Sequence, residues 1–429
     1  MTSDMSDGTN EVYYALFQND QGQKLYQYAY NPELSLKPEK ELTVYTLYDQ
    51  ATINQAATLF QKKHPDTMVS VHVACADTDD KEAETQRNRL MTSLAAGDGE
   101  DVIVLSGLDD NALAKKGVLM DLSDIVTPME ENGELLQAIV DGEKAADGKQ
   151  QILPVRFALP LLLSKEKRAS EMTDLAALAK AAEQTDGSLL GTFTGEDLVE
   201  TFAPYFMPDI IKDKQLDTEK LRTVLQELQT IAAHCDMVEK YKKGERASNE
   251  WDLPSAMQAV LCQISGFNDA MFDLAIINLV KGDYTSFENA YIPTVEIGVN
   301  ANTKQADLAK EFAAFVMSRE VQDGDFYDGF PVNKESLHMQ VSLDRSDYAA
   351  YTTIEGADGQ EIGLDIEPIK AADADKLEAL CDSLSKKTVK DAKVLEELKK
   401  SVPDYLLGRQ SLDDTISKIQ DGVKIYLAE

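Results

Sequence analysis

The chain has 429 residues, of which 43% are hydrophobic, and its 76 acidic and 42 basic residues give a formal net charge of −34. This balance argues against direct nucleic-acid binding, which needs clustered Lys and Arg, and against docking on anionic lipid through a basic face. The length is enough for two or three domains, and the hydrophobic fraction excludes a disordered acidic tail.

The sequence contains no apolar run near the ~18 residues that a membrane span needs. Its first ten residues are polar and lack the basic start and apolar core of a signal peptide. The four cysteines could pair in three ways, but they are far apart and form no Cys-x-x-Cys motif, so we favour unpaired, partly buried thiols. They are Cys75, Cys235, Cys262 and Cys381.

Residues 1–40 differ from the rest of the chain. Two Tyr-rich runs, residues 11–17 and 24–30, flank Asn19-Asp20-Gln21-Gly22, and this pattern predicts a β-hairpin. An isolated hairpin is only marginally stable in water. The hairpin therefore either packs on the main body or is the remnant of an upstream domain, and the sequence leaves both alternatives open.

From residue 41 the pattern alternates between strands and helices. Strands are predicted over residues 42–47, 68–74 and 102–105, with helices over residues 53–63 and 81–96 between them. A β-α-β-α-β order predicts an α/β fold with a parallel sheet and helices on its faces.

Ligands of such sheets bind beyond the carboxyl ends of the strands. Two of the predicted strands end in short polar segments that would lie at that edge. We therefore expect a candidate ligand site at Tyr48, Asp49, Ser106 and Gly107.

Residues 291–334 combine an apolar strand, a turn, an amphipathic helix and a tight Gly-Phe-Pro-Val-Asn loop. The helix is predicted from one apolar stripe, formed by Leu308, Phe312, Phe315 and Val316. In this order the segment resembles the return segment of bacterial extracellular solute-binding proteins of ABC importers, the carbohydrate-type group that includes maltose-binding protein.

The resemblance extends from residue 41 to residue 429. The matching phrases, in chain order, are ELTVYTLYD, RLMTSLAAGDGEDVIVLSG, KKGVLMDLSDIV, DGKQQILPVRF and the terminal YLLGRQSLDDTISKIQDGVKIYLAE, where Ile416, Ile419, Val423 and Tyr426 supply an apolar helix face. The hairpin before residue 41 has no counterpart in the core family.

The resemblance implies a two-lobed, periplasmic-binding-protein-like fold of type II, with ligand held between the lobes. Lobe 1 would comprise residues 41–151 and 292–334, and lobe 2 residues 152–291 and 335–429. The hinge strands would cross near residues 151–155, near 292–299 and after 329–334, and closure around ligand would be a hinge motion.

A sugar site needs flat aromatic rings and hydrogen-bonding groups. Trp251, the sole tryptophan, is one candidate, and Phe267-Asn268-Asp269, where the family places cleft aromatics, is another. Packing in the core is the alternative for both aromatic rings.

Further candidates lie on the crossings. Arg156 follows Leu-Pro-Val on a hinge strand, where it could clamp a carboxylate or a hydroxyl pair or form an interlobe salt bridge. Tyr291 and Phe330 complete the ligand set, with hinge packing as the alternative for Phe330 and its neighbour Asn333. Thr303-Lys304-Gln305 could bind polar ligand atoms at a helix start or act as a plain N-cap.

We find no enzyme motif: Gly-x-Ser-x-Gly and HExxH are absent, and Gly142…Gly148-Lys149 has the wrong spacing for a phosphate loop. We therefore expect no catalysis, no cofactor and no catalytic metal, while a structural calcium ion stays open. The expected function is to bind an extracellular solute, with a carbohydrate favoured, and to deliver it to the permease subunits of an ABC importer. The alternatives are a peptide or anionic solute, or a role as a ligand sensor.

The same resemblance implies an extracellular monomer that is membrane-anchored as a lipoprotein in its full-length precursor. The export signal and the anchor cysteine would then have been removed from this chain.

Overall fold

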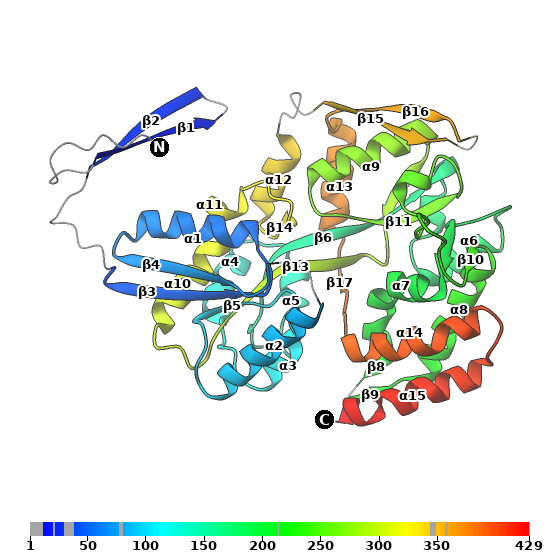
Figure 1. Cartoon of the computed structure of the whole chain (residues 1–429), viewed down its shortest axis with the longest axis horizontal. Coiled ribbons are helices and arrows are strands. Elements are labelled where there is room, and N and C mark those ends of the chain that lie inside the picture. The colour runs from blue at the N-terminus through cyan, green and yellow to red at the C-terminus, as the bar shows by residue number, and fades with distance from the viewer. Residues whose placement is uncertain are drawn as a thin grey trace.

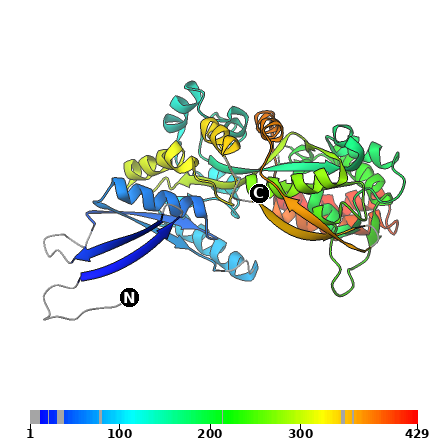
Figure 2. The ribbon, with the colours of Figure 1, turned by 90° about the horizontal axis from the view of Figure 1, so that it is seen from above.

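The computed structural model describes residues 12–19, 22–29, 38–76, 80–212, 214–343, 349–356 and 359–428. The body is a two-lobed α/β fold (Figure 1). One lobe surrounds strands β3 to β5, and the other is built mainly from helices α6 to α8, α14 and α15. Seen from above, the lobes lie at opposite ends of the molecule, with strands running between them (Figure 2). The predicted fold class is confirmed.

Nine strands of the described chain form one sheet. Strands β11, β6, β13, β5, β3 and β4 are neighbours in that order, β12 and β14 also pair with β6, and β17 also pairs with β13. Their bounds are β3 Lys40–Thr46, β4 Thr67–Val73, β5 Val102–Val104, β6 Leu153–Ser164, β11 Ala259–Ile264, β12 Asp283–Ser286, β13 Ala290–Val299, β14 Phe330–Pro331 and β17 Lys386–Lys387.

Strands β6 and β13 connect the lobes. The first half of β6 pairs with β13, whereas its second half pairs with β11 and β12. The far end of β13 pairs in turn with β5. All twelve residues of β6 are buried, which accounts for its nearly continuous apolar sequence.

In the first lobe, β3, β4 and β5 are parallel, as predicted. Alternate residues face opposite sides: Leu42 and Val44 join the core under α1 and α10, whereas Tyr45 and Leu47 join the core under α2 and α3. The helices of this lobe are α1 Ala51–Lys63, α2 Asp80–Ala95, α3 Asp110–Lys115, α4 Ser123–Glu131, α5 Gln137–Asp141, α10 Ala306–Val316 and α11 Arg319–Gln322.

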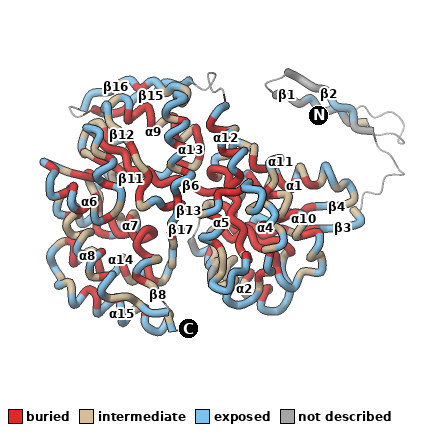
Figure 3. Tube along the Cα trace, turned by 180° about the vertical axis from the view of Figure 1, so that it is seen from behind, coloured by how far each residue is buried: buried red, intermediate tan, exposed pale blue. Residues whose placement is uncertain are grey.

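The second lobe has a separate helical core, and buried residues concentrate inside both lobes (Figure 3). In the last helix, Ile416, Ile419 and Val423 are buried on the predicted apolar face. The elements are η1 Lys165–Lys167, η2 Ala169–Glu171, α6 Leu175–Ala182, β7 Thr192–Thr194, α7 Gly195–Ile210, β8 Ile211–Lys212, β9 Gln215–Leu216, α8 Thr218–Ala233, β10 Asp236–Val238, η3 Glu250–Asp252, α14 Ala392–Leu406 and α15 Leu412–Ala428.

A further layer covers the ends of β6 and β11. Ile354 and Leu364 of an antiparallel hairpin pack into the same core as helix α9, and this hairpin is not predicted from the sequence. The elements of this layer are α9 Phe267–Val280, α12 Lys334–Ser342, β15 Ala350–Glu355, β16 Glu361–Ile366 and α13 Ala371–Asp382.

The predicted N-terminal hairpin is present as a separate two-stranded sheet of β1 Val12–Asn19 and β2 Gly22–Ala29, in which Leu16 pairs with Leu25. Its predicted turn residues Asp20 and Gln21 lie outside the described residues. The four cysteines are thiols in the structure. Among the described residues, none of the helices is both long and apolar enough to cross a membrane.

Candidate functional site

The polar segments that follow β3 and β5 lie together, as their position at neighbouring parallel strands predicts. Gly107 has φ +80°, and an added Cβ would lie 3.4 Å from Tyr48 Cε2. Tyr48 and Ser106 are half-buried, whereas Asp49 and Gly107 are exposed. Asp49 accepts a 2.7 Å hydrogen bond from the side-chain amide of Asn54, so its carboxylate is held near the start of α1.

Ser106 joins this edge to hinge strand β13. Its hydroxyl donates to the carbonyl oxygen of Thr294 at 2.8 Å and accepts a weaker bond from the Glu296 amide at 3.4 Å. The pairing of β13 with β6 is irregular around Pro293 and Val295, and Thr294 lies between them. Such irregularities redirect side chains. The Thr294 hydroxyl is buried and has no hydrogen-bond partner in the described structure.

Arg156 is fully buried on β6 and is held by protein groups. Its Nε donates to Thr52 Oγ1 at 3.1 Å, and its Nη2 donates to the carbonyl oxygens of Val321 and Gly324 at 3.2 and 3.1 Å. Burial lowers the pKa of Arg156 to about 10, so the guanidinium stays charged at neutral pH. The remaining nitrogen, Nη1, is buried without a hydrogen-bond partner among the described residues.

The loop over residues 325–329 packs against Thr52 and Arg156. Asp328 accepts hydrogen bonds from the Thr52 amide and hydroxyl at 2.8 and 2.9 Å. Gly329 has φ +137°, and an added Cβ would overlap Thr294 and lie 2.8 Å from Arg156 Cβ, so only glycine fits. The Phe326 ring lies 5.4 Å from the Arg156 guanidinium carbon. The loop is thus fixed at several points.

Tyr327 projects from this fixed loop with 78% of its surface exposed. It was not predicted as a site residue. The sequence feature that could have indicated Tyr327 is its position directly before Asp328-Gly329, at the third predicted crossing.

The start of α9 approaches the same loop. An added Cβ on Gly266 would lie 3.6 Å from the Phe326 carbonyl oxygen. Asp269 Oδ2 accepts the Ser265 amide at 3.0 Å, whereas Asn268 Oδ1 is buried with no hydrogen-bond partner in the described chain. The predicted residues Asn268 and Asp269 thus lie in the first turn of α9, directly after the Gly266 that contacts Phe326.

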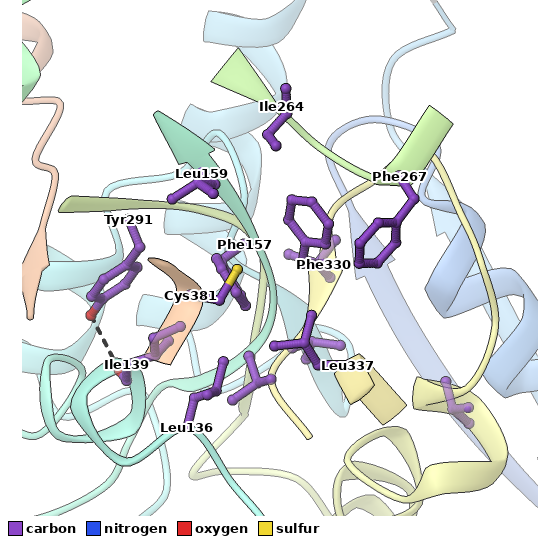
Figure 4. Close-up of a cluster of buried hydrophobic side chains, with 14 of the residues drawn as sticks. Leu136, Ile139, Phe157, Leu159, Ile264, Phe267, Tyr291, Phe330, Leu337 and Cys381 are labelled. Carbon is purple, nitrogen blue, oxygen red and sulfur yellow. Dashed lines mark hydrogen bonds between the residues drawn. The ribbon is translucent and has the colours of Figure 1, made fainter. Parts of the chain in front are cut away.

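Three of the predicted aromatic residues are core residues. Phe267 and Phe330 are each 1% exposed and pack edge to face, with ring centroids 5.0 Å apart (Figure 4). Tyr291 is fully buried and donates to the Ile139 carbonyl oxygen at 3.2 Å. Phe267 and Phe330 thus have the packing role that was the alternative for each, and no free ring face is available to a sugar.

Trp251 is 37% exposed, and its ring lies 4.3 Å from that of Phe272 on α9. One part of the indole therefore packs on the lobe, and another part meets solvent.

Thr303 lies at the opposite edge of the sheet. Its hydroxyl hydrogen-bonds to Asp101, which precedes β5, and accepts the Gln305 amide at 3.0 Å. Asn333 caps α12 by accepting the Ser336 amide at 3.1 Å. Asn333 therefore acts as an N-cap, whereas Thr303 bonds to the amide of Gln305, the residue before α10, and the start of α10 has no side-chain cap.

Three carboxylates near the hinge, those of Asp110, Glu143 and Glu296, lie within 4.8 Å of one another. Such a cluster could hold a cation, but the Lys387 ammonium already hydrogen-bonds to all three. Lys387 thus supplies the cation itself.

A groove of about 600 Å³ lies between α12 and α13 and contains none of the predicted ligand residues. Four of its charged groups form pairs, His338 with Glu378 at 3.0 Å and Arg319 with Glu335 at 2.8 Å. Its lining includes no Phe, Tyr or Trp side chain, so the groove is a weaker candidate than the hinge region.

Comparisons with known proteins agree with the fold. The family model described as bacterial extracellular solute-binding protein matches residues 46–323. Among curated proteins, the comparison finds no match.

Several solved structures are similar to nearly the whole chain. A sugar transporter from Rhizobium etli in an open conformation is 15% identical, with a TM-score of 0.58, and 90% of this chain and 99% of that chain are covered. The sugar-binding protein MalE from Xanthomonas citri is 14% identical, with a TM-score of 0.61 and coverage of 90% and 97%. An ABC substrate-binding protein from Listeria monocytogenes in complex with cycloalternan is 14% identical, with a TM-score of 0.54 and coverage of 91% and 99%.

At these identities the structures show the shared fold, whereas the family model covers well over half of the chain. The chain therefore belongs to the bacterial extracellular solute-binding proteins.

Proposed function

We propose that this protein binds a carbohydrate between its two lobes and delivers it unchanged to the permease subunits of an ABC importer. The family consists of solute-binding proteins that act outside the cytoplasm. Proteins of similar fold are described as a sugar transporter, a sugar-binding protein and a complex with cycloalternan, which supports a carbohydrate as the solute.

The observation that carries the proposal is Tyr327. An aromatic side chain that is 78% exposed, on a loop fixed by the Thr52–Asp328 hydrogen bonds, is a preformed apolar surface. The C–H face of a sugar ring can cover such a surface with little loss of conformational entropy.

The two segments that contact the loop, through Thr52 and through Gly266, also carry polar groups suited to hydroxyls. Tyr48 and Asp49 contribute a phenol and a carboxylate from the strand edge, and Asn268 contributes an amide from the start of α9. Hydroxyl donors and acceptors on both sides of a ring are what a sugar needs.

The state of Arg156 favours a neutral solute. Its guanidinium is buried, and its Nε and Nη2 are hydrogen-bonded to Thr52 and to two carbonyl oxygens, so Nη1, itself buried, is the one nitrogen without a partner among the described residues. No specific observation favours the peptide, anionic or sensor alternatives.

We propose that lobe 1 comprises residues 41–151 and 292–334, and that lobe 2 comprises residues 152–291 and 335–429. Strands β6 and β13 run between these parts and support two of the crossings. We further propose that the protein acts as an extracellular monomer and that its full-length precursor is a membrane-anchored lipoprotein.

A thermal-shift screen against neutral mono- and oligosaccharides, sugar acids and peptides tests the solute class. A ligand at 100 times its Kd should stabilise the protein by about 2.7 kcal/mol. Calorimetry on Tyr327→Ala and Tyr327→Phe then tests the site: loss of the ring should weaken binding about tenfold or more, and Phe should retain most of the affinity. Stabilisation by sugar acids or peptides alone would overturn the carbohydrate proposal. Chromatography of the recovered ligand checks that it is unchanged.

A further inference from the structure

Two consecutive lysines on one short strand contact different lobes. Strand β17, Lys386–Lys387, belongs to the segment between α13 and α14 and pairs in parallel with Ala290–Tyr291 of β13. Successive side chains of a strand point to opposite sides. Lys386 and Lys387 therefore reach into different surroundings from a single crossing of the chain.

Lys387 reaches into the first lobe. Its ammonium donates to Asp110 at 3.0 Å, to Glu296 at 2.9 Å and to Glu143. Asp110 begins α3, Glu143 follows α5, and Glu296 lies on β13. The side chains of Glu143 and Glu296 are only 1% and 9% exposed. One ammonium, on a side chain that is 16% exposed, thus holds three separate segments.

Lys386 reaches into the second lobe. It pairs with Asp209, in the last turn of α7, at 2.8 Å and with Glu288 at 3.1 Å. Glu288 also accepts the Leu175 amide at the start of α6 at 3.1 Å. Together, the two lysines fasten β17 to both lobes, and we call them the β17 clamp.

The Lys387 side of the clamp has more negative than positive charge. Three carboxylates face one ammonium, and the uncharged Tyr291 hydroxyl lies 3.4 Å from Glu143 Oε1. Burial and the neighbouring carboxylate of Glu296 raise the pKa of Glu143 well above its ordinary value. Burial also raises the pKa of Glu296, and the surrounding carboxylates raise that of Lys387.

The effect of pH on the clamp depends on which form of the carboxyl group the packed state favours. A carboxyl group whose pKa is raised in the packed state favours that state when protonated, and this advantage is lost as pH rises through the raised pKa. Ionisation of Glu143 adds a buried negative charge that the single ammonium of Lys387 cannot balance.

We propose that the β17 clamp is a pH-dependent fastening of the hinge, closed while one carboxyl group of the Lys387 cluster carries a proton and loosened when that proton is lost. The consequence for lobe closure rests on the proposed function, but the loosening of β17 does not. The groups that face the titrating site are Asp110 from α3, Glu143 after α5, Tyr291 and Glu296 from β13, and Lys387 itself.

Hydrogen exchange of the ligand-free protein tests the loosening. The peptide over residues 385–389 contains the Thr388 amide, which bonds to the Tyr291 carbonyl oxygen at 3.0 Å. Glu143→Gln keeps the shape but cannot ionise. Comparison of the two proteins at the same pH, from about pH 5 to about pH 9, cancels the intrinsic pH dependence of exchange.

The exchange rates of wild type and Glu143→Gln should coincide at the acidic end, and the wild type should exchange roughly threefold or more faster at the alkaline end. Glu320→Gln is the matched control, because Glu320 on α11 pairs with Lys63 on α1 and contacts none of the clamp residues, and it should follow the wild type. Equal exchange of wild type and Glu143→Gln at every pH would overturn the proposal.

Small-angle X-ray scattering on the same ligand-free samples tests the consequence for the lobes. The wild-type radius of gyration should change with pH, and that of Glu143→Gln should keep its acidic value. A pH-dependent exchange rate with a constant radius of gyration in both proteins would overturn the link to the lobes. Neither readout involves a sugar, so a failed carbohydrate screen leaves both results interpretable.

Discussion

Thr52 donates both its backbone amide and its hydroxyl to the carboxylate of Asp328, at 2.8 and 2.9 Å, across a sequence separation of 276 residues. Thr52 lies in the first turn of α1, where unpaired amides and the helix dipole favour a negative charge. The same carboxylate fixes the loop that presents Tyr327. One residue therefore caps a helix and positions the proposed ligand surface.

Asp328→Ala should lower the free energy of unfolding by about 2 kcal/mol, because two hydrogen bonds to a charged acceptor are lost. It should also weaken carbohydrate binding, since Tyr327 would no longer be held. Asp124→Ala is the control: Asp124 is 64% exposed and pairs with Lys310, so its loss should cost less than about 1 kcal/mol. Urea denaturation measures the free energy of unfolding of the two variants, and equal losses would contradict the capping role of Asp328.

Phe267→Ala and Tyr327→Ala should separate stability from binding. The first removes a side chain that is 1% exposed and should cost about 3–5 kcal/mol. The second removes a side chain that is 78% exposed and should change stability by no more than about 0.5 kcal/mol. Denaturation curves and calorimetry together give both quantities. An unchanged unfolding midpoint for Phe267→Ala would show that its ring is not in the core in solution.

Asp273 should make stability depend on pH. It is 5% exposed on α9, and burial together with Glu250 raises its pKa to about 8. The protonated form favours the fold, so its contribution is complete below the unfolded pKa, declines by about 1.4 kcal/mol per pH unit above it, and is lost once pH passes about 8.

Asp273→Asn removes this titration while keeping the shape of the side chain. The stability of the variant minus that of the wild type should therefore rise between about pH 5 and pH 8 and level off above that range. Thermal unfolding at a series of pH values measures the difference. A difference that does not vary with pH would mean that Asp273 is ionised throughout.

Lys387→Met should cost about 3–5 kcal/mol, because it leaves three carboxylates facing one another without their cation. Lys386→Met should cost less, about 1 kcal/mol, since its partner Asp209 is half exposed and its partner Glu288 keeps the hydrogen bond from the Leu175 amide. Denaturant titrations at neutral pH compare the two variants. A larger loss for Lys386→Met would place the stronger fastening in the second lobe.

Much of the fold follows from local patterns. The strand predicted over residues 102–105 is present as Val102–Val104. Of the predicted stripe, Leu308, Phe312 and Val316 are buried in α10 and Phe315 is partly buried, as the spacing indicates. Apolar periodicity is a property of neighbouring residues, so one segment of sequence is enough to predict it.

The site depends on contacts that no local pattern contains. The burial of Phe267 is set by Phe330, far along the chain, and the exposure of Tyr327 by a loop fixed to Thr52. Lys386-Lys387 is an ordinary basic pair in the sequence, and only the tertiary fold surrounds one of the two with buried carboxylates. Position at a strand end predicts proximity to the site but not the direction of a side chain.

The pairing of β6 with β13 along one half and with β11 and β12 along the other has a consequence for cooperativity. Each lobe completes its part of the sheet with strands that the other lobe also uses. Fragments cut between the lobes should therefore not fold separately. The late segment after β17 also bonds back to α7, through the Val389 amide and the Pro204 carbonyl oxygen at 3.0 Å. Native structure therefore requires nearly the whole chain to be available at once, and unfolding should occur as a single transition.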